Sequence, residues 1–393
     1  MTFLIIFFSI QTLSTLLSLL KVISTQNMVH VLRFSYAGFL LFSGAVKLID
    51  PLGFSYKLQE YFEVFSMEWL VPASLLLSVF IILFEILLGV CLIFGFQIKK
   101  VMWGNLLLMI FFTFLTFFSA YFNKVTDCGC FGDFMKLDPW NSFLKDVHLV
   151  FISVVLFMFQ RYIKPFTKNE LHICVIAVLI PLAFGVYTLS HLPVVDFRAY
   201  KVGTNIIDDR QLPPGAKQDV YEDVWYYEIA GQIQEFSTDE SPWSIEGAVF
   251  KDRVTKLISK GDEPPIHDFD IIDPLTGMNI TDSILNMDVV FLLISYDIQK
   301  TNLAGHVKLD DELVNNLDSQ SIPIYGLSSS SEDEIKKKLS KNDFNYPYFS
   351  VDQTTLKTIV RANPGVIMLQ KGVVKNKWHW RDVPSNIEVI INQ

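Results

Sequence analysis

The chain has 393 residues, of which 51% are hydrophobic and only 19% are charged, and phenylalanine alone occurs 34 times. This composition is too apolar for a soluble protein, so part of the chain is expected to lie in a membrane. The apolar residues gather before about residue 192, whereas the remainder resembles an ordinary acidic globular sequence. The net charge of −9 comes from that second half and argues against nucleic-acid binding.

The first half contains apolar runs of the length that a membrane-spanning helix needs, roughly 20 residues. A run at the very start, from Met1 to Leu20, lacks the basic beginning and the small-residue cleavage site of a signal peptide. It is either an additional span or an upstream extension, because Met28 is an alternative start. The five expected spans after it are residues 29–48, 70–96, 102–122, 146–164 and 171–192.

Basic residues in the short loops predict which loops face the cytoplasm. The loop between the second and third spans and the loop between the fourth and fifth hold Lys99, Lys100, Arg161, Lys164 and Lys168. We expect these two loops on the cytoplasmic side of a bacterial inner membrane. The loops at 49–69 and 123–145, and everything after residue 192, are then expected on the periplasmic side.

Three charged residues lie at membrane depth or at its edge. Glu85 falls inside the second span, and Lys47 and Asp50 end the first. A carboxylate is costly to bury in lipid, so Glu85 is a candidate functional residue. The alternative, which we favour, is that Glu85 pairs with another side chain in the bundle and fixes helix packing.

Two of the four cysteines are separated by a single residue, and both are expected to face an oxidising compartment in which disulfides persist. A disulfide between residues two apart closes a small, strained ring, and the intervening glycine lets the backbone bend to close it. Strained, exposed disulfides exchange readily, so Cys128 and Cys130 are the candidate catalytic residues. Their loop reads Asp127-Cys128-Gly129-Cys130-Phe131-Gly132-Asp133.

Three other interpretations of the pair remain open: a static disulfide, two ligands of a metal site, or two thiols without a role. A metal site is disfavoured because the usual ligand spacing is wider and no His or further Cys lies nearby. Asp127 and Asp133 flank the pair, and nearby carboxylates disfavour the thiolate and slow its attack. Cys91 and Cys174 fall near the inner ends of two spans and are expected only to pack.

Several runs of the membrane half resemble known families. The run from Ser43 to Gly53 and the run around Glu85 resemble the first two helices of the DoxX family. The sequence Cys128-Gly129-Cys130-Phe131-Gly132 resembles the related MauE branch, named for methylamine utilisation. The resemblance covers roughly residues 28–165 and implies a four-helix membrane protein associated with periplasmic thiol redox and partner maturation. Together with its fifth span and outer domain, the chain is similar to Bacteroidetes-type DoxX proteins.

The second half begins with a linker at 193–265, in which we expect a strand at 225–229 and a helix at 250–259. From residue 266 to residue 393, strands and helices alternate. The expected strands are 288–294, 321–327, 348–349, 366–369 and 373–378, and the expected helices are 308–318, 330–339 and 352–361.

The order of these elements resembles that of a thioredoxin-like domain of the TlpA kind. Asn363-Pro364-Gly365 resembles the cis-proline segment of that fold, which implies that Asn363 and Pro364 contact a partner. The place of the redox Cys-X-X-Cys motif is taken by Ser295 to Lys300, and no cysteine follows Cys174. The domain is therefore expected to be a docking module or a degenerate cap, without thiol chemistry of its own.

The expected architecture is an α-helical membrane bundle, with a DoxX-like four-helix core plus one or two extra spans, followed by an α/β thioredoxin-like domain. The expected function is thiol–disulfide exchange by Cys128 and Cys130 with a periplasmic protein or a quinone, with no metal and no other cofactor. The alternative is a non-catalytic membrane scaffold that docks an envelope protein during maturation. Lipid and a periplasmic client are the expected partners. The expected parts of the chain are 1–27, 28–165, 171–192, 193–265 and 266–393.

Overall fold

The computed structural model describes residues 2–125, 129–166, 170–259, 261–314, 316–317, 321–339 and 346–384. The chain divides into two compact units. The first contains Met1–Arg198 together with two short segments from the end of the sequence, Val360–Gly365 and Trp378–Pro384. The second contains Ala199–Ile359 and Val366–Lys377.

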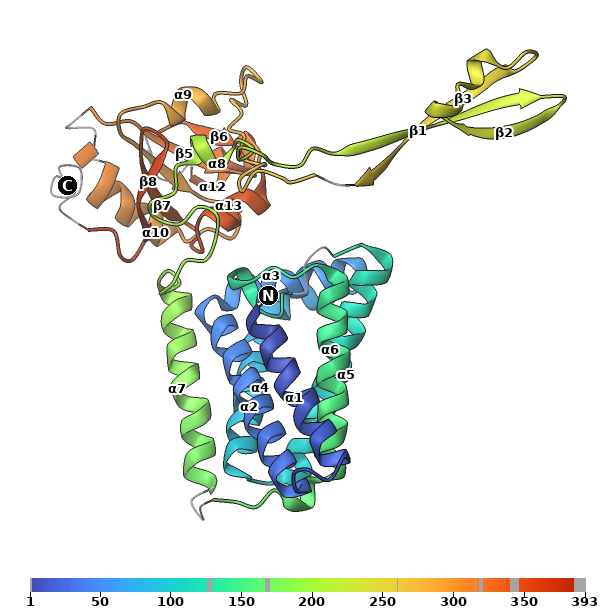
Figure 1. The fold of residues 1–393 in the computed structure, drawn as a ribbon. Coiled ribbons are helices and arrows are strands. Elements are labelled where there is room, and N and C mark those ends of the chain that lie inside the picture. The colour runs from blue at the N-terminus through green and yellow to red at the C-terminus, as the bar shows by residue number, and fades with distance from the viewer. Residues whose placement is uncertain are drawn as a thin grey trace. The chain divides into compact units, whose positions relative to one another are not determined.

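The first unit is a bundle of apolar helices (Figure 1). Among the described residues, five helices are long and apolar enough to cross a membrane, so the chain is a multi-pass membrane protein, as expected. The fourth begins at Pro139 rather than at residue 146, because Asp138 caps its N-terminus by accepting a hydrogen bond from the backbone N–H of Asn141. The five are α2 (Thr25–Ile49), α4 (Ser74–Phe94, preceded by the 3₁₀ helix Glu68–Ala73), α5 (Ile98–Phe122), α6 (Pro139–Met158) and α7 (Glu170–Ser190).

Two further helices complete the bundle. The shorter apolar helix α1 (Thr2–Leu19) contacts α2 and α6 through Gln11, which donates a hydrogen bond to Ser35 and lies 3.0 Å from Nε2 of His148. The N-terminal apolar run is therefore a helix of the bundle. Helix α3 (Pro51–Val64) follows α2 directly.

The loops gather at the two ends of the bundle in the pairs that the basic residues predict. At one end, the backbone N–H of Phe166 donates to the carbonyl of Phe94, which brings the two basic loops together. At the opposite end, the Thr188 hydroxyl of α7 lies 3.4 Å from the Leu48 carbonyl oxygen of α2. The chain therefore leaves α7 at the same end of the bundle as α3.

Helices α2 and α4 approach closely because glycines lie at their contact. A Cβ atom on Gly44 of α2 would come 2.6 Å from Cγ1 of Ile86, and one on Gly89 of α4 would come 3.2 Å from the Ala37 carbonyl oxygen. Small residues allow such close approach of membrane helices. The contact holds Glu85, the neighbour of Ile86 in α4, at the surface of α2.

We expect Gly44→Ala to destabilise the bundle, because the added methyl group must displace Ile86. Overpacking of this kind costs about 1–3 kcal/mol, which should lower the melting temperature of the detergent-solubilised protein. Gly38→Ala on the same helix is the matched control, since no atom lies within 4 Å of its Cβ position. Equal melting temperatures for the two variants would contradict this account of the α2–α4 contact.

After the short helix α8 (Ile206–Asp209), the second unit forms a three-stranded antiparallel sheet of order β2-β1-β3 (Figure 1). Its strands are β1 (Val220–Ile229), β2 (Gln232–Ser237) and β3 (Val249–Ser259). The strand expected at 225–229 is present, but the helix expected at 250–259 is wrong, because these residues form β3. Phe250, Val254 and Leu257 have helical spacing, yet pairing with β1 overrides that local pattern.

The remainder of the second unit forms a five-stranded sheet of order β6-β5-β4-β7-β8. Strands β4, β5 and β6 run parallel, and the β7–β8 hairpin turns at Lys371-Gly372 beside β4. Parallel strands on one side of β4 and a later β-hairpin on its other side form the thioredoxin-like arrangement, so the predicted fold class is confirmed. The elements are β4 (Val290–Ile294), β5 (Ile324–Ser328), β6 (Tyr348–Ser350), β7 (Gly365–Gln370), β8 (Val373–His379), α9 (Thr281–Leu285), α10 (Leu303–Leu309), α12 (Glu332–Leu339) and α13 (Gln353–Ile359).

One expected helix of this domain is placed differently. The helix expected at 308–318 begins earlier, as α10, and continues as a π-helical turn at Asp310–Val314. Residues 315 and 318 lie outside the described residues.

Candidate functional site

The cysteine loop is described from Gly129 onward, and Asp127 and Cys128 lie outside the described residues. Cys130 is 6% exposed and belongs to the apolar core of the bundle. The adjacent ring of Phe131 is also buried, and it packs against Phe39 and Phe42 of α2 at centroid distances of 5.6 and 5.9 Å. These contacts anchor the loop in the bundle immediately after the second cysteine.

Gly129 lies where the loop needs a residue without a side chain. Its φ angle is +66°, in the left-handed region that favours glycine. A Cβ atom there would also come 3.0 Å from Cγ of Lys57 on α3. The expectation that Gly129 lets the backbone bend between the cysteines therefore agrees with the geometry.

A chain of hydrogen bonds leads from Cys130 into the bundle. The hydroxyl of Ser43 donates to the Cys130 carbonyl oxygen at 3.1 Å, and Lys47 Nζ donates to the Ser43 hydroxyl at 2.9 Å. Lys47 Nζ also donates to Glu85 Oε2 at 2.6 Å, and these two side chains are only 1% and 2% exposed. Glu85 is therefore paired inside the bundle, and its partner is Lys47.

A second buried ion pair joins Lys145 and Asp146 of α6. The Thr116 hydroxyl of α5 donates to Asp146 Oδ2 at 3.0 Å, and the Lys145 ammonium group lies 5.6 Å from the centre of the Phe131 ring. Sequence reasoning missed this pair because it began the fourth span at residue 146, which left Lys145 in a loop. The N-cap at Asp138 would have placed both residues inside the helix.

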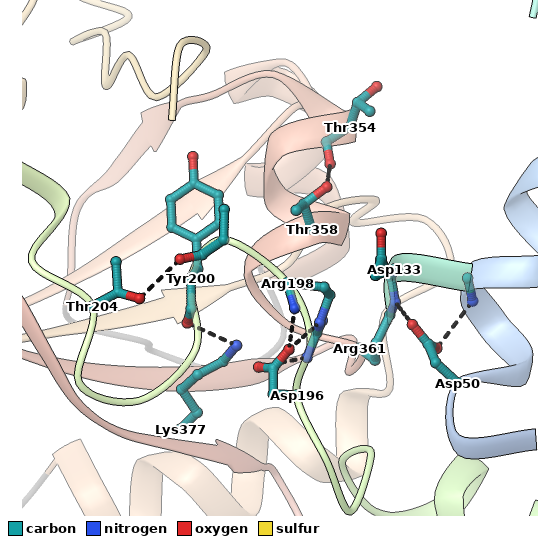
Figure 2. Close-up of polar contacts among 12 residues, drawn as sticks. Asp50, Asp133, Asp196, Arg198, Tyr200, Thr204, Thr354, Thr358, Arg361 and Lys377 are labelled. Carbon is teal, nitrogen blue, oxygen red and sulfur yellow. Dashed lines mark hydrogen bonds and ion pairs between the residues drawn. The ribbon is translucent and has the colours of Figure 1, made fainter. Parts of the chain in front are cut away.

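Asp50 and Asp133 are joined by Arg361, which sequence reasoning did not single out (Figure 2). Asp50 Oδ1 caps α3 by accepting from the Gly53 N–H at 3.0 Å, while its Oδ2 accepts from Arg361 Nε at 2.7 Å. Arg361 Nη2 donates to Asp133 Oδ2 at 3.2 Å. We call these three residues the Arg361 bridge.

The Arg361 bridge changes the electrostatics that the sequence suggested for the cysteine loop. The guanidinium group is 7% exposed; burial alone would lower the pKa of Arg361, but the carboxylates of Asp50 and Asp133 outweigh burial and raise that pKa above its ordinary value. Arg361 therefore stays charged and compensates the charge of Asp133. The expected slowing of thiol attack by that carboxylate is correspondingly weaker.

The proline segment follows the bridge directly in the sequence. The Asn363–Pro364 peptide bond is cis, as the resemblance to the thioredoxin-like segment predicts. Residues Val360–Gly365 belong to the first unit, which also contains the cysteine loop. Asn363 and Pro364 thus lie within three residues of a side chain that binds this loop.

The position that holds Cys-X-X-Cys in redox-active thioredoxins, Ser295 to Lys300, begins in the core and ends with the exposed residues Gln299 and Lys300. Ser295 is fully buried, and its hydroxyl lies 3.1 Å from Nε2 of His306, which also lies 3.0 Å from the Thr301 hydroxyl. Burial lowers the pKa of His306 to about 4, so this imidazole is neutral at pH 7. Within the described part of the chain, no group of three or more His, Cys, Asp or Glu residues is arranged to hold a metal ion.

Comparison with known protein families finds a match in the membrane half of the chain. The family model for methylamine utilisation protein MauE matches residues 25–159, which contain α2 to α6 and the cysteine loop. This match confirms the predicted resemblance to MauE, while the resemblance to DoxX stays a prediction. No curated protein sequence matches the chain.

One solved structure is similar to part of the chain. It is a solution structure from Bacteroides thetaiotaomicron described as a candidate protein disulfide isomerase, with 11% sequence identity and a TM-score of 0.26. The similarity covers 32% of this chain and 82% of that one.

We expect Lys47→Met to destabilise the protein by about 3–5 kcal/mol, because it leaves the Glu85 carboxylate buried without its cation. The double variant Lys47→Met with Glu85→Leu should recover most of that loss, since apolar residues often replace a buried ion pair without penalty. Melting temperatures in detergent measure both effects. A double variant less stable than the single variant would contradict a purely structural pairing.

Arg361→Ala should release the cysteine loop, because Asp133 loses its cation and repels Asp50. We expect thiol alkylation of Cys130 in the otherwise cysteine-free protein to become about fivefold faster, which corresponds to about 1 kcal/mol of loop opening. The alkylation rate of Arg361→Lys should fall between the rates of the unchanged protein and of Arg361→Ala, since an ammonium group lacks the forked guanidinium geometry that contacts two carboxylates. Arg253→Ala, on the exposed face of β3, is the control. Unchanged alkylation in Arg361→Ala would show that the bridge does not hold the loop.

Proposed function

We propose that this membrane protein is a thiol–disulfide exchange component, in which Cys128 and Cys130 alternate between dithiol and disulfide at the periplasmic face of a bacterial inner membrane. The observation that carries the proposal is the Arg361 bridge. It ties the loop that bears the cysteines to the residues that lead into the Asn363–Pro364 segment. A reactive pair and a candidate peptide-binding segment are thereby held in one compact unit.

The exchange transfers two electrons from a client protein. A client thiolate attacks the Cys128–Cys130 disulfide, forms a mixed disulfide with one cysteine and releases the other as a thiolate. The second client thiolate then attacks the mixed disulfide, so the client leaves oxidised and the pair is left as a dithiol. A quinone in the bilayer would take the two electrons and two protons of that dithiol and become a quinol.

We propose different tasks for the two cysteines. Cys130 is buried against the bundle, so Cys128 is the residue expected to bond to the client. Lys47 reaches the backbone carbonyl of Cys130 through the Ser43 hydroxyl, and this chain of hydrogen bonds would keep Cys130 in place while Cys128 reacts. Asn363 and Pro364 would bind the extended backbone of the client beside its cysteine.

A second candidate function is a scaffold without exchange chemistry. The burial of Cys130 and the anchoring of the loop by Phe131 and Arg361 favour it, because a static disulfide would sit in such a fixed loop. In that case the thioredoxin-like domain would hold an envelope protein during its maturation.

The redox state of Cys128 and Cys130 in living cells distinguishes the two functions. Cells that carry Cys91→Ser and Cys174→Ser are quenched in acid and alkylated with a mass tag, so that only the pair is counted. We expect a mixed population that shifts toward dithiol in a reducing medium. In addition, Cys130→Ser should accumulate a mixed disulfide with the client through Cys128, whereas Cys128→Ser should not.

A pair that stays fully oxidised in both media, with no mixed disulfide in either single variant, would overturn the exchange function. It would favour the scaffold.

A further inference from the structure

Two cysteines outside the proposed site meet at the opposite end of the bundle. Cys91 lies about one turn before the end of α4 at Phe94, and Cys174 lies about one turn after the start of α7 at Glu170. Their sulfur atoms are 3.5 Å apart, although 83 residues separate them in the sequence. Sequence reasoning treated each as a packing residue, and the structure shows that they pack against each other.

The distance is that of two thiols in contact, because the sulfur atoms of a disulfide are about 2.05 Å apart. The two sulfur atoms meet between helices that already pack together, so a disulfide between them would join neighbouring helices. Such a bond would join α7 covalently to α4. Helix α7 connects the bundle to the C-terminal half of the chain, so the bond would hold this connecting helix against α4.

The surroundings of the pair indicate where an oxidant would come from. Cys91 is buried in the bundle core, whereas Cys174 is only partly buried. Helix α7 has the smallest buried share of the five spanning helices, so most of its surface faces the lipid. An oxidant dissolved in the bilayer would therefore reach Cys174 first.

We propose that Cys91 and Cys174 form a second redox site, which a lipid-soluble quinone converts to a disulfide. The Cys174 sulfur adds to the quinone ring and forms a carbon–sulfur bond. The Cys91 sulfur then attacks Cys174, so the sulfur–sulfur bond forms as the carbon–sulfur bond breaks and its electron pair stays on the ring. The two thiol protons complete the quinol. This site uses neither cysteine of the proposed exchange function and stands independently of it.

The test uses the full-length protein with Cys128→Ser and Cys130→Ser, in lipid nanodiscs, treated with a ring-substituted ubiquinone analogue. Free thiols are counted after denaturation with a maleimide mass tag. We expect two tags before treatment, none afterwards and two again after dithiothreitol. One quinol should form per protein, as measured by the loss of quinone absorbance. The further variant Cys174→Ser should keep its single tag and form no quinol.

A protease site inserted in the loop between α6 and α7 tests which helices are joined. After cleavage, the two fragments of the quinone-treated protein should run together on a non-reducing gel and separately on a reducing gel. Retention of both tags after treatment would overturn the proposal. So would fragments that separate without reductant, or a loss of tags that Cys174→Ser also shows.

Discussion

A charged side chain buried among membrane helices must be paired with an opposite charge, and the ion pair between Lys47 and Glu85 satisfies this constraint inside the bundle. The ion pair fixes the rotation of α2 and α4 about their own axes, because Lys47 and Glu85 must face each other. The glycines at the contact allow the two helices to come close enough for the pair to form. Lys47 in turn holds Ser43, whose hydroxyl binds the carbonyl of Cys130. The position of the cysteine loop thus depends on the buried charge of Lys47, which lies on another helix.

The same end of the bundle carries a second electrostatic constraint. Asp50 caps α3 and Asp133 follows the cysteines, and these two carboxylates would repel each other without the Arg361 guanidinium group. Arginine suits this place because its fork donates to two acceptors and its charge persists when buried. The residue that binds the cysteine loop through Asp133, Arg361, therefore lies more than two hundred residues further along the chain.

The three cysteines that the structure describes lie in two chemically different surroundings. The Cys130 carbonyl accepts a hydrogen bond from Ser43, which in turn accepts one from the buried Lys47 ammonium group. Cys91 and Cys174 meet near the other end of the helices, where Cys91 belongs to the apolar core of the bundle. The thioredoxin-like domain contains no cysteine, and at the start of the position that holds Cys-X-X-Cys in redox-active thioredoxins Ser295 makes a buried hydrogen bond with His306.

Local patterns in the sequence were enough to predict the membrane helices, the family resemblance and the fold of the C-terminal domain. Apolar runs of spanning length predicted the five helices, the Cys-Gly-Cys-Phe-Gly run predicted the MauE resemblance, and alternating elements predicted the thioredoxin-like fold with its cis proline. Each of these signals depends on neighbouring residues. They are readable because hydrophobic period, turn chemistry and short motifs act within a few residues.

The tertiary structure alone decided which distant residues meet. The partners of Glu85 and Asp133, and the contact of Cys91 with Cys174, join positions separated by 38, 228 and 83 residues. The β3 strand shows the same limit, since its apolar residues have helical spacing and only pairing with β1 makes it a strand. Burial, ion pairing and strand pairing are properties of the folded chain. The free energy of burying a charge, or of forming a strand, depends on the residues that surround it in space.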